Sequence, residues 1–248
     1  EAASRTSIKV PGVQTELLER LSKLNKPVIV VLMNGRPLDL THENELADAM
    51  LEAWYPGTMG GKAVTQVLFG EYNPSGKLTM SFPMNVGQIP LYYYAKNTGR
   101  PIYLPNDKYK SKYIDCPNDP LFPFGYGLSY ASFVYSDIKL SSSELTEKGS
   151  IKATVAVTNN GGHDGEEVVQ CYVRDLVGSV TRPVKELKGF EKISLKAGES
   201  KTVNFEITPE MLAFHRQDMT YGTEPGDFQL FIGGNSRDVK MIPFKLLP

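Results

Sequence analysis

The amino-acid sequence predicts an α/β domain with a mostly parallel sheet in a three-layer sandwich, followed by an all-β sandwich. The first prediction rests on residues 26–83, where apolar runs of strand length alternate with segments of helical periodicity. Strand–helix–strand order of this kind is typical of a parallel sheet with helices on both faces. The second prediction rests on residues 133–246, where about seven short runs are separated by turn signals, as in immunoglobulin-like or fibronectin-type sandwiches.

The first half begins with a predicted helix and a predicted strand. Leucines recur at helical spacing over residues 13–24, and residues 28–33 form a continuous apolar run rich in β-branched side chains. Such a run predicts a strand buried on both faces, which ends at the turn signal Asn34-Gly35. Thr41 is expected to be the N-cap of the next helix. Four residues are expected on the apolar side of that helix: Leu46, Ala47, Met50 and Leu51.

The same alternation continues to residue 82. Residues 53–55 are expected to form a second strand, with Trp54 in the core, and residues 78–82 a third. Between them, a helix is predicted to begin at Gly60 and Gly61. The glycines at 57, 60 and 61 fit neither a dinucleotide-binding nor a P-loop fingerprint, so tight strand-to-helix packing is preferred over phosphate binding.

Composition limits the classes of function. The 248 residues have room for one large domain or two of ordinary size, and 41% of them are hydrophobic, which is enough to bury a core. The formal net charge is -1 and no basic stripe is present, which argues against nucleic-acid binding. No apolar run is long enough to span a membrane.

Cysteines and histidines give no sign of a metal site. Cys116 and Cys171 are too few for a disulfide framework, and their spacing is not that of a zinc site. The histidines at 42, 163 and 215 are scattered, so each is expected to be an ordinary surface or half-buried residue. The sequence therefore predicts no metal and no cofactor, and it leaves the redox compartment undetermined.

Residues 84–128 are rich in Tyr, Pro, Asn and Gly and show no sustained period. Long loops in compact proteins are usually functional or pack between domains. Aromatic residues interleaved with Asn, Arg and Asp also suit sugar binding. For most of these tyrosines we favour packing over sugar binding. They are expected to cover the sheet edge and to pack between two domains.

Several long segments, in this order, resemble the C-terminal half of glycoside hydrolase family 3, in particular its bacterial, periplasmic-type β-glucosidases. They are EAASRTSIKVPGVQ, KPVIVVLMNGRPL, WYPGTMGGKAVTQVLFGEYNPSGKLTMSFP and PLFPFGYGLSYASF. VTRPVKELKGFEKISLKAGES followed by EPGDFQLFIG resembles that family's fibronectin type III-like domain. The resemblance covers essentially the whole chain and is more specific for the family than for the substrate.

The family has three domains, and the resemblance implies that this chain holds two of them. Residues 1–130 are expected to be the α/β sandwich domain with its aromatic-rich linker, and residues 131–248 the fibronectin type III-like domain. The missing (β/α)8 barrel would carry the aspartate nucleophile. The acid/base glutamate would be Glu1, in the motif Glu1-Ala2-Ala3-Ser4-Arg5. Arg5 would either orient nearby carboxylates or form a structural salt bridge.

This division predicts that the chain alone is inactive. Retaining glycosidases need two carboxyl groups about 5–5.5 Å apart, and only one would be present. An α-ammonium group on Glu1 would also favour its ionised form, which is wrong for a general acid. Two other interpretations remain open: a non-catalytic scaffold or interaction module, and a flavodoxin-like ligand-binding domain. Nothing in the sequence resembles a cofactor loop, which disfavours the latter.

The resemblance also bears on location and partners. It implies a periplasmic or secreted parent that acts on a β-glucoside or oligosaccharide, with a β-xylosidase-type specificity as the alternative. The missing barrel is an expected partner, whereas nucleic acid and a membrane span are not expected. An exposed apolar patch is predicted near Glu1 and the 84–128 loops, and homo-oligomerisation through it is left open.

Overall fold

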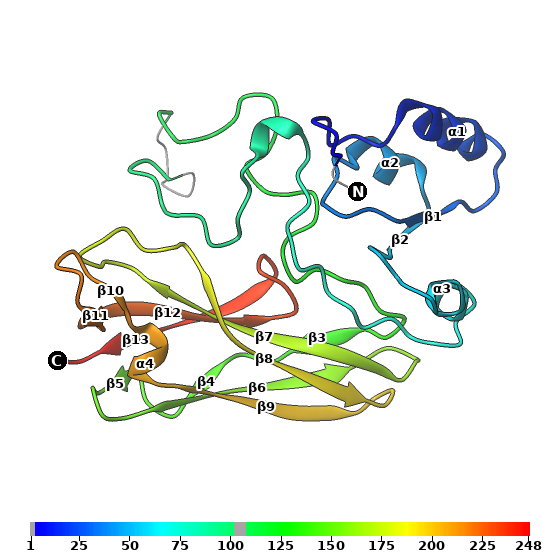
Figure 1. The fold of residues 1–248 in the computed structure, drawn as a ribbon. Coiled ribbons are helices and arrows are strands. Elements are labelled where there is room, and N and C mark those ends of the chain that lie inside the picture. The colour runs from blue at the N-terminus through cyan, green and yellow to red at the C-terminus, as the bar shows by residue number, and fades with distance from the viewer. Residues whose placement is uncertain (1–2, 102–107) are drawn as a thin grey trace. The chain divides into compact units, whose positions relative to one another are not determined.

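The structure is a computed structural model that describes residues 3–101 and 108–248, and the chain divides into two compact units (Figure 1). The first unit comprises residues 1–72, 80–91 and 112–123. The second comprises residues 73–79, 92–111 and 124–248. It therefore takes in three segments that precede residue 131. The domain boundary after residue 130 stays a prediction from the sequence.

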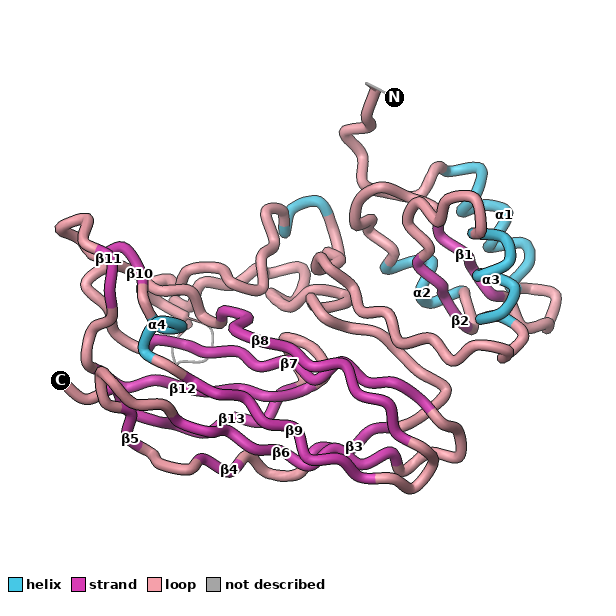
Figure 2. The backbone as a smooth tube through the Cα atoms, turned by 60° about the horizontal axis from the view of Figure 1, so that its bottom comes forward, coloured by secondary structure: helices cyan, strands magenta, loops and turns pink. Residues whose placement is uncertain are grey.

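The first unit is built on two parallel strands. Strands β1 (Ile29–Leu32) and β2 (Ala49–Glu52) lie side by side, with Ile29 opposite Ala49 and Leu32 opposite Glu52 (Figure 2). The predicted α/β class is thus confirmed, with parallel strands. The helices are α1 (Gly12–Ser22), α2 (Thr41–Leu46), α3 (Gly60–Leu68) and the short 3-10 helix η1 (Val86–Gln88). Buried apolar side chains of this unit include Ile8, Leu18, Leu32, Leu40 and Phe82.

The second strand lies earlier than predicted, and the helix before it is shorter. Helix α2 ends at Leu46 and Ala47 is extended, so Met50 and Leu51 belong to β2 rather than to the apolar side of a helix. The physical reason lies at Asp48. Its N–H donates to the Val28 carbonyl over 2.9 Å, and its carboxylate accepts the Val28 N–H over 2.7 Å. Sheet pairing therefore replaces the helix at this residue.

Three further expectations for this unit are wrong. The N-cap of α2 is Leu40, and the Thr41 hydroxyl instead donates to the Met84 carbonyl over 2.9 Å. Residues 78–82 form no strand, because Phe82 makes only an isolated bridge with Phe122. Strand β1 is not buried on both faces, since Ile29 at its start is 49% exposed. Within the described ranges, β2 is the only strand paired with β1.

The second unit is the predicted all-β sandwich. One sheet has the order β5-β13-β12-β7-β8, and the other has the order β3-β6-β4 with β9 also paired to β6 (Figure 1). A core of side chains such as Val155, Leu230 and Ile232 lies between the sheets. Its strands are β3 (Phe133–Tyr135), β4 (Lys139–Leu140), β5 (Glu144–Leu145), β6 (Ile151–Asn159), β7 (Gly165–Asp175), β8 (Glu186–Leu195), β9 (Ser200–Ile207), β12 (Gly226–Gly233) and β13 (Val239–Leu246).

Period two is clear in β6, whose residues alternate between buried and more exposed positions from Ile151 onward. The predicted strand over residues 133–140 is instead split into β3 and β4. Four short elements were not predicted: strand β5, helix α4 (Pro209–Leu212) and the paired strands β10 (Phe214–His215) and β11 (Tyr221–Gly222). Each is too short to show a period in the sequence.

Polar side chains on β7 hold earlier segments of the chain in the second unit. Lys77 forms a 3.0 Å ion pair with Glu167, whose side chain is only 6% exposed and which also accepts a 2.8 Å hydrogen bond from the Tyr135 hydroxyl. The Gln170 amide donates to the carbonyls of Gly125 and Gly234 over 3.2 and 2.6 Å. Residues 73–79 and 124–128 are therefore fastened by buried contacts to the sandwich.

We expect Gly125→Ala to destabilise the second unit more than Gly198→Ala. Both glycines have positive φ, +80° and +79°, so alanine at either position costs about 1–2 kcal/mol. A Cβ on Gly198 meets nothing within 4 Å, whereas a Cβ on Gly125 would overlap the Gln170 side chain. Overpacking of this kind adds about 1–3 kcal/mol. Urea unfolding measures both variants, and equal losses of unfolding free energy would contradict the proposed crowding at Gly125.

Candidate active-site edge of the α/β unit

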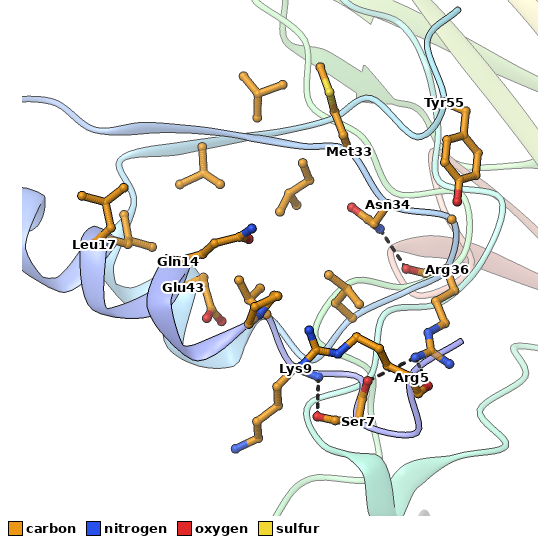
Figure 3. A pocket seen from close by; sticks show the side chains of 18 of the residues that line it. Arg5, Ser7, Lys9, Gln14, Leu17, Met33, Asn34, Arg36, Glu43 and Tyr55 are labelled. Carbon is orange, nitrogen blue, oxygen red and sulfur yellow. Dashed lines mark hydrogen bonds between the residues drawn. The ribbon is translucent and has the colours of Figure 1, made fainter. Parts of the chain in front are cut away.

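A groove of about 710 Å³ lies in the first unit between α1, β1 and the segment that precedes α1 (Figure 3). Leu17 and Gln14 of α1 stand on one side of it, and Met33 stands on the β1 side. The groove is apolar along β1. It becomes polar beyond the carboxyl end of that strand, where Arg5, Ser4, Ser7, Asn34 and Arg36 line it.

Backbone contacts anchor the motif-bearing segment at this polar end. The Arg36 guanidinium donates to the carbonyls of Arg5 and Ser7, the latter over 3.1 Å. The Asp39 N–H donates to the Ile8 carbonyl over 2.9 Å. Residues 5–8 are thereby held beyond the carboxyl end of β1. In open parallel sheets, ligands bind outside the carboxyl ends of the strands, so this is where a reactive group would be expected.

Arg5, one of the two predicted site residues, lines this groove. Its side chain extends into the groove from the polar end (Figure 3). Among residues 3–101 and 108–248, no carboxylate forms an ion pair with its guanidinium. An orienting role for Arg5 stays a prediction. Glu1, the predicted acid/base, lies outside the described residues, so its role also stays a prediction.

A half-buried carboxylate at the same edge was not predicted from the sequence. Glu52 ends β2, and its Oε1 accepts the Trp54 N–H over 2.9 Å. Burial raises the pKa of Glu52, although the hydrogen bond from the Trp54 N–H acts in the opposite direction. Within the described part of the chain, Glu52 Oε2 has no hydrogen-bond partner. A charged residue directly after an apolar strand run is the sequence signal that could have identified it.

The turn after β1 and the residues after β2 fit together closely. A Cβ on Gly35 would overlap the ring and hydroxyl of Tyr55, so glycine is needed for their approach. Trp54 has a positive φ of 48°, which is uncommon for a bulky residue. Its ring centroid lies 5.9 Å from that of the buried Phe82, but Trp54 itself is only half-buried and follows β2, so its predicted place in a core strand is wrong.

Exposed apolar side chains are present around the groove, whereas the patch expected near Glu1 and the 84–128 loops stays a prediction. Leu17, Met33 and Tyr55 line it and are 57%, 65% and 82% exposed. Their position relative to Glu1 lies outside what the structure describes. In the 84–128 region, Val86 is 62% exposed and Ile89 is 49% exposed, so this region is also partly apolar at its surface.

The tyrosines of the aromatic-rich stretch differ in their contacts. Tyr93 stacks on Phe124 at a centroid distance of 4.2 Å and meets Tyr172 edge-on at 5.8 Å. Tyr92 and Tyr94 stack on each other at 5.2 Å and are about half exposed. Packing therefore accounts for Tyr93, whereas the exposed pair leaves sugar binding open as a function.

The described residues show no cluster of three or more His, Cys, Asp or Glu side chains arranged to hold a metal ion. Cys116 and Cys171 are both free thiols. Among the helices that the structure describes, none has the length and apolarity required to cross a bilayer.

The protein thus combines a parallel α/β unit, which has a polar groove beyond a strand end, with an all-β sandwich. Residues 1–130 match the glycosyl hydrolase family 3 C-terminal domain, and residues 167–236 match the fibronectin type III-like domain. The chain belongs to glycoside hydrolase family 3 and is a C-terminal part of such a protein.

Similar proteins share this chain's whole length. A periplasmic beta-glucosidase of Salmonella typhimurium is 54% identical over 100% of the chain, and a beta-xylosidase of Formosa agariphila is 45% identical over 98%. The crystal structure of a beta-glucosidase from Listeria innocua in complex with glucose superposes with a TM-score of 0.95 at 43% identity, over 100% of this chain. The chain spans only about a third of these proteins: 32%, 33% and 35%.

We expect Glu52→Gln to change the pH dependence of stability. A carboxyl group whose folded pKa is raised favours folding in its protonated form, so this stabilisation is lost as pH rises from the ordinary glutamate pKa, about 4.3, through the folded value. The amide variant cannot ionise. Its unfolding free energy relative to the parent chain should therefore increase over that pH window and then level off.

Trp54, the one tryptophan of the sequence, reports this transition by fluorescence because it is adjacent to Glu52. Glu16→Gln is the matched control, since Glu16 is an exposed residue that pairs with Arg20 on α1. If the two variants show the same pH profile relative to the parent chain, burial does not set the ionisation of Glu52.

Proposed function

We propose that this chain is the C-terminal part of a retaining β-glucosidase that removes terminal β-linked glucose from oligosaccharides or glycosides. One observation carries the proposal: the segment that follows the Glu1–Arg5 motif is anchored beyond the carboxyl end of β1 by Arg36. The names of the similar proteins, which include beta-glucosidases, support the same substrate class.

The proposed reaction has two steps and uses two carboxyl groups. An aspartate on the barrel, outside this chain, attacks the anomeric carbon while the protonated Glu1 donates its proton to the leaving glycosidic oxygen. The C–O bond breaks and a covalent glycosyl-enzyme forms. Glu1, now ionised, then takes a proton from water as the water attacks the same carbon and releases the sugar.

Arg5 is the proposed positioning residue for this proton transfer. It stands four residues after Glu1 and extends into the polar end of the groove. A guanidinium near a carboxylate favours its ionised form, which suits the base step rather than the acid step.

The chain alone should release no measurable nitrophenol from a nitrophenyl β-glucoside. The reason is that it would lack the nucleophile, and a single carboxyl group cannot perform the double displacement. The assay compares the purified 248-residue chain with the complete enzyme at equal molar concentration. Turnover by the chain alone that survives further purification would contradict the proposed division of catalytic groups.

In the complete enzyme, Glu1→Gln should lower kcat by about 10²- to 10⁴-fold for substrates with a poor leaving group. The loss should be much smaller for a dinitrophenyl glucoside, whose leaving oxygen departs without a proton. Glu16→Gln, on the exposed face of α1, serves as the control and should leave both rates unchanged. Equal losses on the two substrates would exclude Glu1 as the general acid.

Activity assays with nitrophenyl glycosides also distinguish two alternative functions of the parent protein. The similarity to a beta-xylosidase keeps a xylose-specific parent as the second candidate, and a higher kcat/KM for the nitrophenyl xyloside would establish it. A non-catalytic scaffold would hydrolyse neither substrate in its complete form. By resemblance, we propose a periplasmic or secreted location for the parent protein.

A further inference from the structure

The turn after β1 contains one of the two Asn-Gly pairs of the sequence, Asn34-Gly35, and the other pair is Asn160-Gly161. In such a pair the backbone nitrogen of the glycine can attack the side-chain carbonyl carbon of the asparagine. Glycine favours this attack because it has no Cβ to hinder the approach and its backbone dihedrals are permissive. The two pairs differ in how strongly the fold restrains them.

The backbone nitrogen of Gly35 is available for this attack. Gly35 is exposed at the polar end of the groove, and its N–H donates no hydrogen bond to any residue of the described ranges. Tyr55 packs against Gly35 but is itself 82% exposed. The turn is therefore open to water, which the reaction needs in its second step.

The Asn34 side chain is folded over the same turn (Figure 3). Its Nδ2 donates to the carbonyl of Arg36, two residues further on, over 2.8 Å. Asparagine side chains that bond to their own backbone in this way curl over the intervening peptide, so Asn34 Cγ is directed toward the Gly35 nitrogen. Within the part of the chain that the structure describes, Asn34 Oδ1 has no hydrogen-bond partner that would hold it elsewhere.

The second pair is restrained by hydrogen bonds. The Gly161 N–H donates to Asn159 Oδ1 over 3.0 Å, so its nitrogen is already occupied. Asn159 is buried, and its Nδ2 donates to the carbonyls of His163 and Leu195 over 2.8 and 3.3 Å. The acceptor of the Gly161 N–H is thus fixed in place. Asn160-Gly161 is therefore a natural comparison for Asn34-Gly35 in the same chain.

We propose that Asn34 is a site of spontaneous deamidation and that this modification releases residues 5–8 from the carboxyl end of β1. The Gly35 nitrogen forms a bond to Asn34 Cγ, the Cγ–Nδ2 bond breaks, and ammonia leaves with the proton of the Gly35 N–H. Water then opens the resulting succinimide ring at either of its carbonyls. The product is aspartate or isoaspartate at position 34.

Either product changes the contacts at this edge of the sheet. A carboxylate has no N–H to donate to the Arg36 carbonyl. It also adds a negative charge at the edge where Glu52, a half-buried carboxyl group, ends β2. Isoaspartate further lengthens the backbone between β1 and Arg36, whose guanidinium holds the carbonyls of Arg5 and Ser7. Residues 5–8 should therefore lose their anchor.

The first test incubates the folded 248-residue chain at mildly alkaline pH and follows deamidation by peptide mapping with mass spectrometry. Deamidation should be at least tenfold faster at Asn34 than at Asn160. In concentrated urea, where the fold is lost, the two residues should react at similar rates. Equal rates in the folded chain would overturn the proposal. A preference for Asn34 that is as large in urea would also overturn it, because local sequence would then be the cause.

Hydrogen exchange tests the release of residues 5–8. The Asp39 N–H donates to the Ile8 carbonyl over 2.9 Å, so its exchange rate reports whether this segment is anchored. Asn34→Asp has the side chain of one product and should accelerate exchange at Asp39 at least tenfold. Asn160→Asp adds the same charge elsewhere and should leave that rate unchanged. The release is refuted if the two variants have the same effect. No readout uses glycosidase activity, so the result is independent of the proposed function.

Discussion

Hydrogen bonding along the two edges of strand β1 is the constraint on which the first unit depends. A parallel strand in the middle of a sheet needs partners on both sides, because its N–H and C=O groups alternate between them. One side is occupied by β2. The other is lined by apolar side chains of β1 and α1. Ile29 and Met33, both of which belong to an apolar run of six residues, are 49% and 65% exposed.

The second unit has its strands paired into two main sheets. Its two sheets enclose a core in which Val155, Leu230 and Ile232 are at most 1% exposed. The buried Glu167 neutralises Lys77, and Gln170 satisfies the carbonyls of Gly125 and Gly234. A buried charge is stable only when it is paired, so these contacts determine which earlier segments belong to the sandwich. The sandwich thereby serves as an anchor for short segments that lie outside its own strands in the sequence.

The candidate site and the groove both depend on the parallel arrangement of β1 and β2. Parallel strands end at a common edge, and here Asn34 follows β1 while Glu52 ends β2. Arg36 adds the motif-bearing segment to that edge. The polar end and the apolar side along β1 are thus parts of a single groove.

The sequence by itself determined the class of each half, because apolar periodicity and turn residues are local properties. Runs such as 151–159 and 28–33 identify strands, and the long ordered motifs identify the family. Tertiary structure alone decided where β2 begins, that residues 78–82 form no strand, and which segments join the sandwich. Each of these depends on a contact between residues distant in sequence, such as Asp48 with Val28 or Lys77 with Glu167. No local pattern encodes such a contact, so the raised pKa of Glu52 and the open edge of β1 became visible only in the fold.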